Sequence, residues 1–159
     1  MKVVNTVFPT SEQFQDFFGA PDDGPFVMVN LLKFHAKAQY EDGSDAHISG
    51  REAYARYGAV VTGLVEALGG RIRYSGAVTG LLLGEVEELW DAVALAEYPS
   101  LAAFQAMALS PEMHAIEHHR KAGLAGQLNI RTRPAAGFET RGLEDDDRMW
   151  KPELAEAVN

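Results

Sequence analysis

Hydrophobic residues occupy both alternations of one short segment, FVMVNLLKF, which runs from Phe26 to Phe34. Its middle carries a polar residue, Asn30. Successive side chains of a strand point to opposite faces, so a strand that is apolar on both alternations is covered on both faces. The segment therefore predicts the central strand of a sheet, with helices on one side and a second layer on the other.

Helical and strand periodicities follow this central strand in a regular order. Ser49 and Glu52 have the spacing of a capping box, and the apolar residues after them recur at steps of three and four, which predicts a long helix. Residues 85–88 are too polar for a core and predict a hairpin connection. The predicted elements are a helix up to Leu68, strands over residues 71–83 and 89–98, a short helix after Ser100, a helix from Ser110 to about Ala122, and a strand over residues 124–132.

A short helix precedes the central strand and a polar tail follows the last one. Thr10 and Gln13 again have capping-box spacing, and three phenylalanines after them form an apolar stripe that would dock on the core. The tail holds the acidic run 144–147 and Trp150, which would anchor it. The expected division is an N-terminal extension over 1–24, a domain over 25–132 and an acidic C-terminal tail over 133–159.

The order strand, helix, strand, strand, helix, strand predicts an α+β protein. Two βαβ halves in sequence form a ferredoxin-like, four-stranded antiparallel sheet with both helices on one face. The other sheet face then needs a cover. A second copy of the chain would supply it, because isologous dimers are the commonest oligomers.

Composition and charge narrow the class of protein. The chain has 159 residues, the size of one domain, and no cysteine, which excludes disulfides and thiolate chemistry. Its 23 acidic and 14 basic residues give a formal charge of −9, which disfavours nucleic acid as a partner. No apolar run approaches the roughly 20 residues that span a bilayer, and no signal peptide is evident. We expect a cytoplasmic protein that binds neither nucleic acid nor membrane.

Several motifs, taken together and in order, resemble the domain of unknown function 1330 family of the dimeric α/β-barrel superfamily. The resemblance covers about Phe26 to Ile130 and implies a ferredoxin-like fold and a homodimer whose two sheets face each other. It implies no defined activity; superfamily relatives include cofactor-independent monooxygenases, muconolactone isomerase and chlorite dismutase, several with a pocket between sheet and helices. The motifs are VNLLKF at 29–34, AYARY at 53–57, GG and a strand from Gly69, WDAVALAEYPS at 90–100 and HHR at 118–120.

Three residues are candidates for catalysis. Asn30 lies among apolar neighbours, where a buried amide either bonds nearby backbone or orients a ligand carbonyl or an oxyanion. His119 is the histidine we expect to face the sheet, where it would act as acid or base. Glu97 shares a strand face with apolar residues, so it would be a base or would pair with a cation such as Arg73 or Arg120.

Four aromatic residues would line a substrate pocket, although aromatic residues at helical spacing also build cores. Arg73 alternates with apolar residues in its strand and would bind a carboxylate or phenolate, or else face solvent. The aromatic candidates are Tyr54, Tyr57, Trp90 and Tyr98.

Metal and cofactor signals are weak. His114 and His118 are four residues apart and could together hold Zn²⁺, and with Glu117 they match an H-x-x-E-H string. We reject a protease, because those enzymes are larger and take a third ligand from a later helix, and we favour a solvated polar face. The sequence holds no P-loop, no G-x-G-x-x-G and no nucleophile elbow, so we expect no metal and no cofactor.

Two functions remain. One is a cofactor-independent oxygenase or isomerase acting on a small, partly aromatic molecule, with Asn30 polarising a carbonyl and His119 moving a proton. The alternative is a non-catalytic module that binds a small molecule or only dimerises. An enclosed cavity with both side chains pointing into it favours the first; a filled interior, with both bonded to protein, favours the second.

Overall fold

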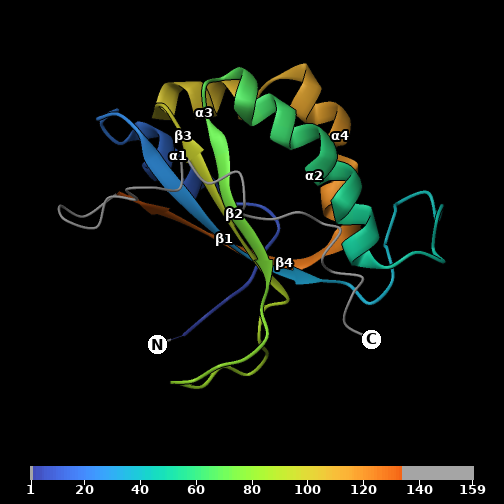
Figure 1. The fold of residues 1–159 in the computed structure, drawn as a ribbon. Coiled ribbons are helices and arrows are strands. Elements are labelled where there is room, and N and C mark those ends of the chain that lie inside the picture. Colours follow the sequence, from blue (N-terminus) through green and yellow to red (C-terminus); the bar gives the residue numbers. More distant parts are fainter. Residues whose placement is uncertain (1, 134–159) are drawn as a thin grey trace, which may run out of the picture.

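The structure, a computed structural model, describes residues 2–133 (Figure 1). Trp150 and the acidic run 144–147 lie outside the described residues. The elements are α1 (Ser11–Gly19), β1 (Phe26–Phe34), α2 (Gly50–Ala67), β2 (Arg71–Ala77), β3 (Ala92–Tyr98), α3 (Leu101–Ala108), α4 (Pro111–Gly123) and β4 (Leu124–Thr132).

The four strands form one sheet in the order β2-β3-β1-β4, and all neighbours are antiparallel. The predicted central strand, β1, lies between β3 and β4. The helices cover one face of this sheet (Figure 1). This confirms the predicted α+β, ferredoxin-like arrangement.

The helices begin at the predicted capping residues. Thr10 and Ser49 each accept a hydrogen bond from the backbone of the residue three positions later, and both form complete capping boxes. Ser110 caps α4, whose first residue is Pro111, a position where proline loses no helical hydrogen bond. Local sequence therefore determines where these helices start.

The hairpin between β2 and β3 differs from the prediction. The expected strand over residues 71–83 ends at Ala77, and the next strand begins at Ala92 rather than residue 89. Ala77 is opposite Ala92, the last pair of the ladder. The backbone N–H of Val78 still donates to the carbonyl oxygen of Asp91, and the Asp91 side chain accepts from the backbone N–H of Phe34. Residues 78–91 thus form a long connection in place of a tight turn at 85–88.

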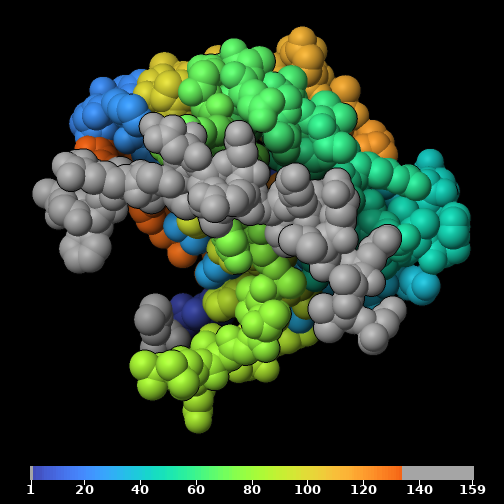
Figure 2. Space-filling model, viewed as in Figure 1, coloured from blue at the N-terminus to red at the C-terminus, as the bar shows by residue number. Residues whose placement is uncertain are grey.

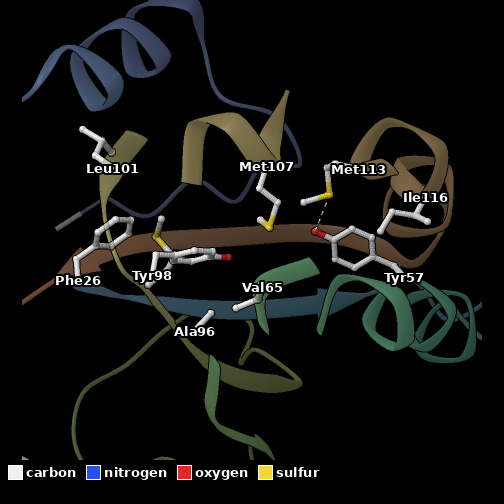
Figure 3. Close-up of a cluster of buried hydrophobic side chains, with 10 residues drawn as sticks. Phe26, Tyr57, Val65, Ala96, Tyr98, Leu101, Met107, Met113 and Ile116 are labelled. Atoms are coloured by element: carbon white, nitrogen blue, oxygen red, sulfur yellow. Dashed lines mark hydrogen bonds between the residues drawn. The ribbon is translucent and has the colours of Figure 1, made fainter. Parts of the chain in front are cut away.

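The core lies between the sheet and the helices (Figure 3). Phe26 and Val65 are each 1% exposed, and Tyr98 stacks on Phe26 with ring centroids 5.4 Å apart. α1 docks at one end of this core, where Phe17 and Phe18 pack against Phe104 of α3. The phenylalanine stripe of the N-terminal helix is therefore a packing surface.

The start of α2 touches the end of α4 through two glycines. A Cβ placed on Gly50 would lie 2.5 Å from the carbonyl oxygen of Gly123, and one placed on Gly123 would lie 2.5 Å from that of Gly50. Real Cβ atoms do not approach oxygen this closely, so the helices reach this separation because neither position carries a side chain.

We therefore expect Gly50→Ala to lower the free energy of unfolding by about 1–3 kcal/mol, because the added methyl group meets the backbones of both Gly123 and His35, which must move away. Gly63→Ala is the matched control in the same helix, where an added Cβ meets nothing within 4 Å. It should raise stability by about 0.5–1 kcal/mol, because alanine is the better helix former. Urea unfolding measures both; equal effects of the two substitutions would contradict the close contact.

Candidate functional site

Asn30 points to the helix-covered side of β1, on the same alternation as Phe26 and Leu32. Its amide Nδ2 donates to the carbonyl oxygens of Met28 and Ala94, at 3.3 and 3.2 Å. Its Oδ1 accepts from Nε2 of Gln127 at 3.0 Å. Protein groups therefore occupy both ends of the amide.

Asn30 is the end of a polar chain that joins three elements. Arg120 of α4 donates to Oε1 of Gln127 at 2.8 Å and to Oε1 of Glu117 at 2.7 Å. The Arg120 side chain is 13% exposed, so the ion pair with Glu117 is largely shielded from water. The polar chain Glu117–Arg120–Gln127–Asn30 thus ties α4 to β4 and β1.

Gln127 is the residue that sequence reasoning missed. In β4 the polar residues Gln127, Asn129 and Arg131 alternate with Leu128 and Ile130, a pattern typical of an edge strand with its polar side in solvent. The register places Gln127 opposite Leu32, on the helix side, and Gln127 is 7% exposed. A sequence signal exists, but it predicts the wrong face.

His119 does not face the sheet, contrary to the prediction. The apolar face of α4, set by Met113 and Ile116, continues through Arg120, which lies about one hundred degrees around the helix from His119. The His119 ring instead reaches the loop between β1 and α2, where its Nδ1 lies 2.7 Å from the hydroxyl of Tyr40. It shares no bonding partner with Asn30 among the described residues.

Tyr40 and His119 belong to a polar clamp with Arg56 and Asp45. Arg56 of α2 donates to the Tyr40 hydroxyl at 3.3 Å and pairs with Asp45 at 2.6 Å. The Tyr40 hydroxyl thus has two partners, Arg56 and the His119 ring, and the tautomer of His119 sets which atom donates in the bond between the two rings. Burial lowers the pKa of His119, and the neighbouring His118 and Arg56 lower it further, against an opposing effect of Asp45.

The polar face of α4 shows no metal-binding arrangement. Glu117 pairs with Arg120. Within residues 2–133, no three histidine, aspartate or glutamate side chains are placed to share an ion.

Glu97 lies on the other side of the sheet from Asn30. Its carboxylate forms an ion pair with Arg73, and Nε of Arg71 is 3.7 Å from the same oxygen. The expected partner Arg73 is therefore confirmed. The side chains of Arg73 and Glu97 are 20% and 25% exposed, so this pair sits on a partly covered surface.

Three of the four aromatic candidates are packed in the core. The rings of Tyr54 and Tyr57 are 5.4 Å apart, and the Tyr57 hydroxyl donates to the sulfur of Met113 at 3.8 Å (Figure 3). Burial raises the pKa of Tyr54 and of Tyr98 to about 12. Trp90 is apart from them, at the sheet end, where its Nε1 donates to Oδ1 of Asn5 at 2.7 Å.

A surface groove of about 520 Å³ lies beside the N-terminal segment, and none of the predicted site residues lines it. It is an open depression at the joint of β1, α4 and β4. Its walls are Thr6, Val7, Phe8, His35, Gln39, Lys121, Leu124 and Ala125.

The sheet face opposite the helices is mainly apolar, and within residues 2–133 no helix lies over it. Directly opposed residues of antiparallel strands lie on the same face of the sheet. Ile130 is opposite Val29, and Leu95 is opposite both Val29 and Tyr74, so these four residues share the face. Tyr74 is 51% and Ile130 45% exposed. We call this surface the open sheet face, formed by Val27, Val29, Leu31, Tyr74, Val93, Leu95, Leu128 and Ile130, with the pair Arg73–Glu97 at one end.

These features define a ferredoxin-like α+β protein with its helices on a single sheet face. The chain belongs to the family described as domain of unknown function (DUF1330), whose family model matches residues 44–131. The resemblance drawn from the motifs is thereby confirmed.

Solved structures of a relative support this assignment. The crystal structure of the methylated RPA0582 protein is 36% identical, covers 85% of this chain and 98% of its own, and has a TM-score of 0.77. A second structure of RPA0582, a protein of unknown function from Rhodopseudomonas palustris, is 36% identical over 83% of this chain and 98% of its own, with a TM-score of 0.75. No curated protein matches the chain. Within residues 2–133, no helix is long and apolar enough to cross a bilayer.

The polar chain predicts a structural role for Asn30. Asn30→Ala should lower the free energy of unfolding by about 1–3 kcal/mol, because Gln127 loses its acceptor in a buried place. Asn129→Ala, at the exposed residue opposite Asn30, should change stability by less than about 0.5 kcal/mol. Chemical denaturation of both variants tests this; equal stability of the two would show that the amide is not held by the polar chain.

The polar clamp predicts a pH dependence. Since the folded-state pKa of His119 lies below its ordinary value of 6.5, the unfolded chain binds the proton more readily, and this contribution to stability is lost as pH falls below that value. Arg56 holds the carboxyl pKa of Asp45 below its ordinary value of 3.8. The stability that this ion pair contributes is therefore lost only at lower pH than the effect of His119.

Melting temperatures at about pH 7.5 and about pH 5.5 measure the effect. The fall between them should be smaller in His119→Gln than in the unmodified protein, and unchanged in a variant of the exposed His114, His114→Gln. An equal fall in all three proteins would rule out the clamp as the source.

Proposed function

We propose that this protein is a homodimeric, non-catalytic module in which two copies cover each other's open sheet face. The observation that carries the proposal is the inverted alternation of β4. Its polar side chains Gln127 and Arg131 face the helix layer, whereas Leu128 and Ile130 face away from it. An edge strand with water on its outer side would show the opposite arrangement.

The rest of the open sheet face supports the same proposal. Apolar side chains from all four strands meet there, and a patch of this kind on a soluble protein marks an interaction surface. A second copy is the natural occupant, because a twofold axis through the face lets each apolar row meet its own equivalent. The pair Arg73–Glu97 would then lie at the rim of the interface, where charges favour correct registration over affinity.

The interior argues for the non-catalytic alternative over an oxygenase or isomerase. Asn30 and His119 are bonded to different protein partners on different elements. Tyr54, Tyr57 and Tyr98 fill the space between sheet and helices. Binding of a small, partly aromatic molecule stays a prediction. The surface groove beside Phe8 is the candidate site for such a molecule.

The test is the molar mass of the full chain in solution, measured by light scattering after size exclusion. The unmodified protein should have twice the monomer mass. Leu95→Glu and Ile130→Glu should each have the monomer mass, because each substitution puts one glutamate per copy, two per dimer, into an apolar interface. Ile130 is already 45% exposed in one copy, so its variant should keep the monomer fold.

Val60→Glu provides the matched control, because Val60 is also 45% exposed but lies on α2, in the helix layer. It should remain dimeric. A monomeric unmodified protein at micromolar concentration, or a control disrupted as strongly as the sheet variants, would refute the proposal.

A further inference from the structure

The connection between β2 and β3 projects from the body of the protein on the side away from the helices (Figure 2). We call residues 78–91 the leucine arm. They form no helix or strand, and their three consecutive leucines, Leu81, Leu82 and Leu83, are 51%, 94% and 83% exposed. We infer that the leucine arm docks on a second copy of this chain, an inference that rests on the proposed homodimer and adds an interface to it.

The base of the leucine arm is held firmly. Lys33, whose side chain is 22% exposed, pairs with Glu88 at 3.1 Å and with Asp91 at 3.4 Å, and donates to the carbonyl oxygen of Leu89 at 3.0 Å. Trp90 bonds Asn5 of the N-terminal segment. Connections of about a dozen residues or more without secondary structure are uncommon in compact domains and are usually functional. The leucine arm therefore has a hydrogen-bonded base and an exposed apolar tip, which is the arrangement expected of a segment that binds another surface.

The position of the leucine arm favours a second copy as its partner. β3 leads directly from the arm base into the open sheet face, because Val93 follows within two residues of Asp91. A partner seated on the open sheet face would therefore lie next to the arm as well. By twofold symmetry both arms would reach across, each to the other copy.

The area of the open sheet face is a second reason to place the leucine arm in the dimer interface. Strand spacing of about 4.8 Å and a rise of about 3.3 Å per residue give this face, with two nine-residue and two seven-residue strands, a flat area of roughly 500 Å². A stable interface buries about 800 Å² on each partner. The leucine arm is the adjoining apolar surface that can supply the remainder.

The charge of the leucine arm disfavours other partners. Glu85, Glu87 and Glu88 lie beside the leucines. Anionic membrane surfaces and nucleic acid would repel these carboxylates.

A triple variant tests the inference in the full chain. Leu81→Ser, Leu82→Ser and Leu83→Ser combined should weaken dimerisation by about tenfold or more in sedimentation equilibrium, because the apolar tip is lost. Leu109→Ser, at an exposed leucine between α3 and α4, should leave the dimer unchanged. The three leucines are solvent-exposed in one copy, so replacing them should not disturb the fold. The far-ultraviolet circular dichroism of the triple variant should match that of the unmodified protein.

A fluorescent label reports burial of the tip directly. The chain has no cysteine, so Leu82→Cys carries a single environment-sensitive dye. Its emission should shift to the blue over the same concentration range as dimerisation, and a dye on Leu109→Cys should not respond. A dye already shielded at monomer concentrations would mean that the chain covers its own tip, and would overturn the inference.

The two proposals fail in different ways. If the triple variant dimerises normally while Leu95→Glu is monomeric, the leucine arm has no part in assembly and the homodimer stands. If the unmodified chain is monomeric, both are refuted.

Discussion

The alternation of side chains along β1 is the constraint from which the other parts of the structure follow. Phe26 and Leu32 pack on one face of β1, against the helix layer. Because side chains alternate along the strand, Val29 and its neighbours lie on the other face. The described helices all lie on the first side, so none of them covers the apolar residues of the second side. A shift of the register by one residue would exchange the two surfaces, so the core and the open sheet face depend on each other.

The polar side chains inside the helix layer serve its construction. The polar chain from Glu117 to Asn30 pairs its members with one another, and no buried side-chain nitrogen or oxygen within residues 2–133 lacks a partner. The polar clamp around Tyr40 links the loop between β1 and α2 to α4. Buried polar groups carry a large penalty when unpaired, so networks of this kind specify one arrangement of the elements. Asn30 and His119, whose residue types suggest catalysis in the sequence, here form hydrogen bonds between sheet, helix and loop.

The leucine arm adjoins the open sheet face at the start of β3, where Asp91 is two residues before Val93. Lys33 connects them, since it extends from β1 to the base of the arm and bonds Leu89 and Asp91. Assembly would thus combine a rigid, flat surface with a projecting segment. Such a combination buries more area than a flat sheet alone and gives the interface a defined orientation.

The sequence by itself determined the elements that depend on local chemistry. The capping residues Thr10, Ser49 and Ser110, the apolar run of β1 and the strand–helix order were sufficient to predict the ferredoxin-like fold. Tertiary structure decided which face each residue occupies. The polar alternation of β4 resembles a solvent face until pairing with β1 turns Gln127 toward Arg120, and one residue of helical rotation brings Arg120 rather than His119 over the sheet. The end of β2 likewise depended on pairing, because its ladder with β3 stops at Ala77 and Ala92. Periodicity specifies that two faces exist, but only pairing between distant segments assigns each face to the core or to the surface.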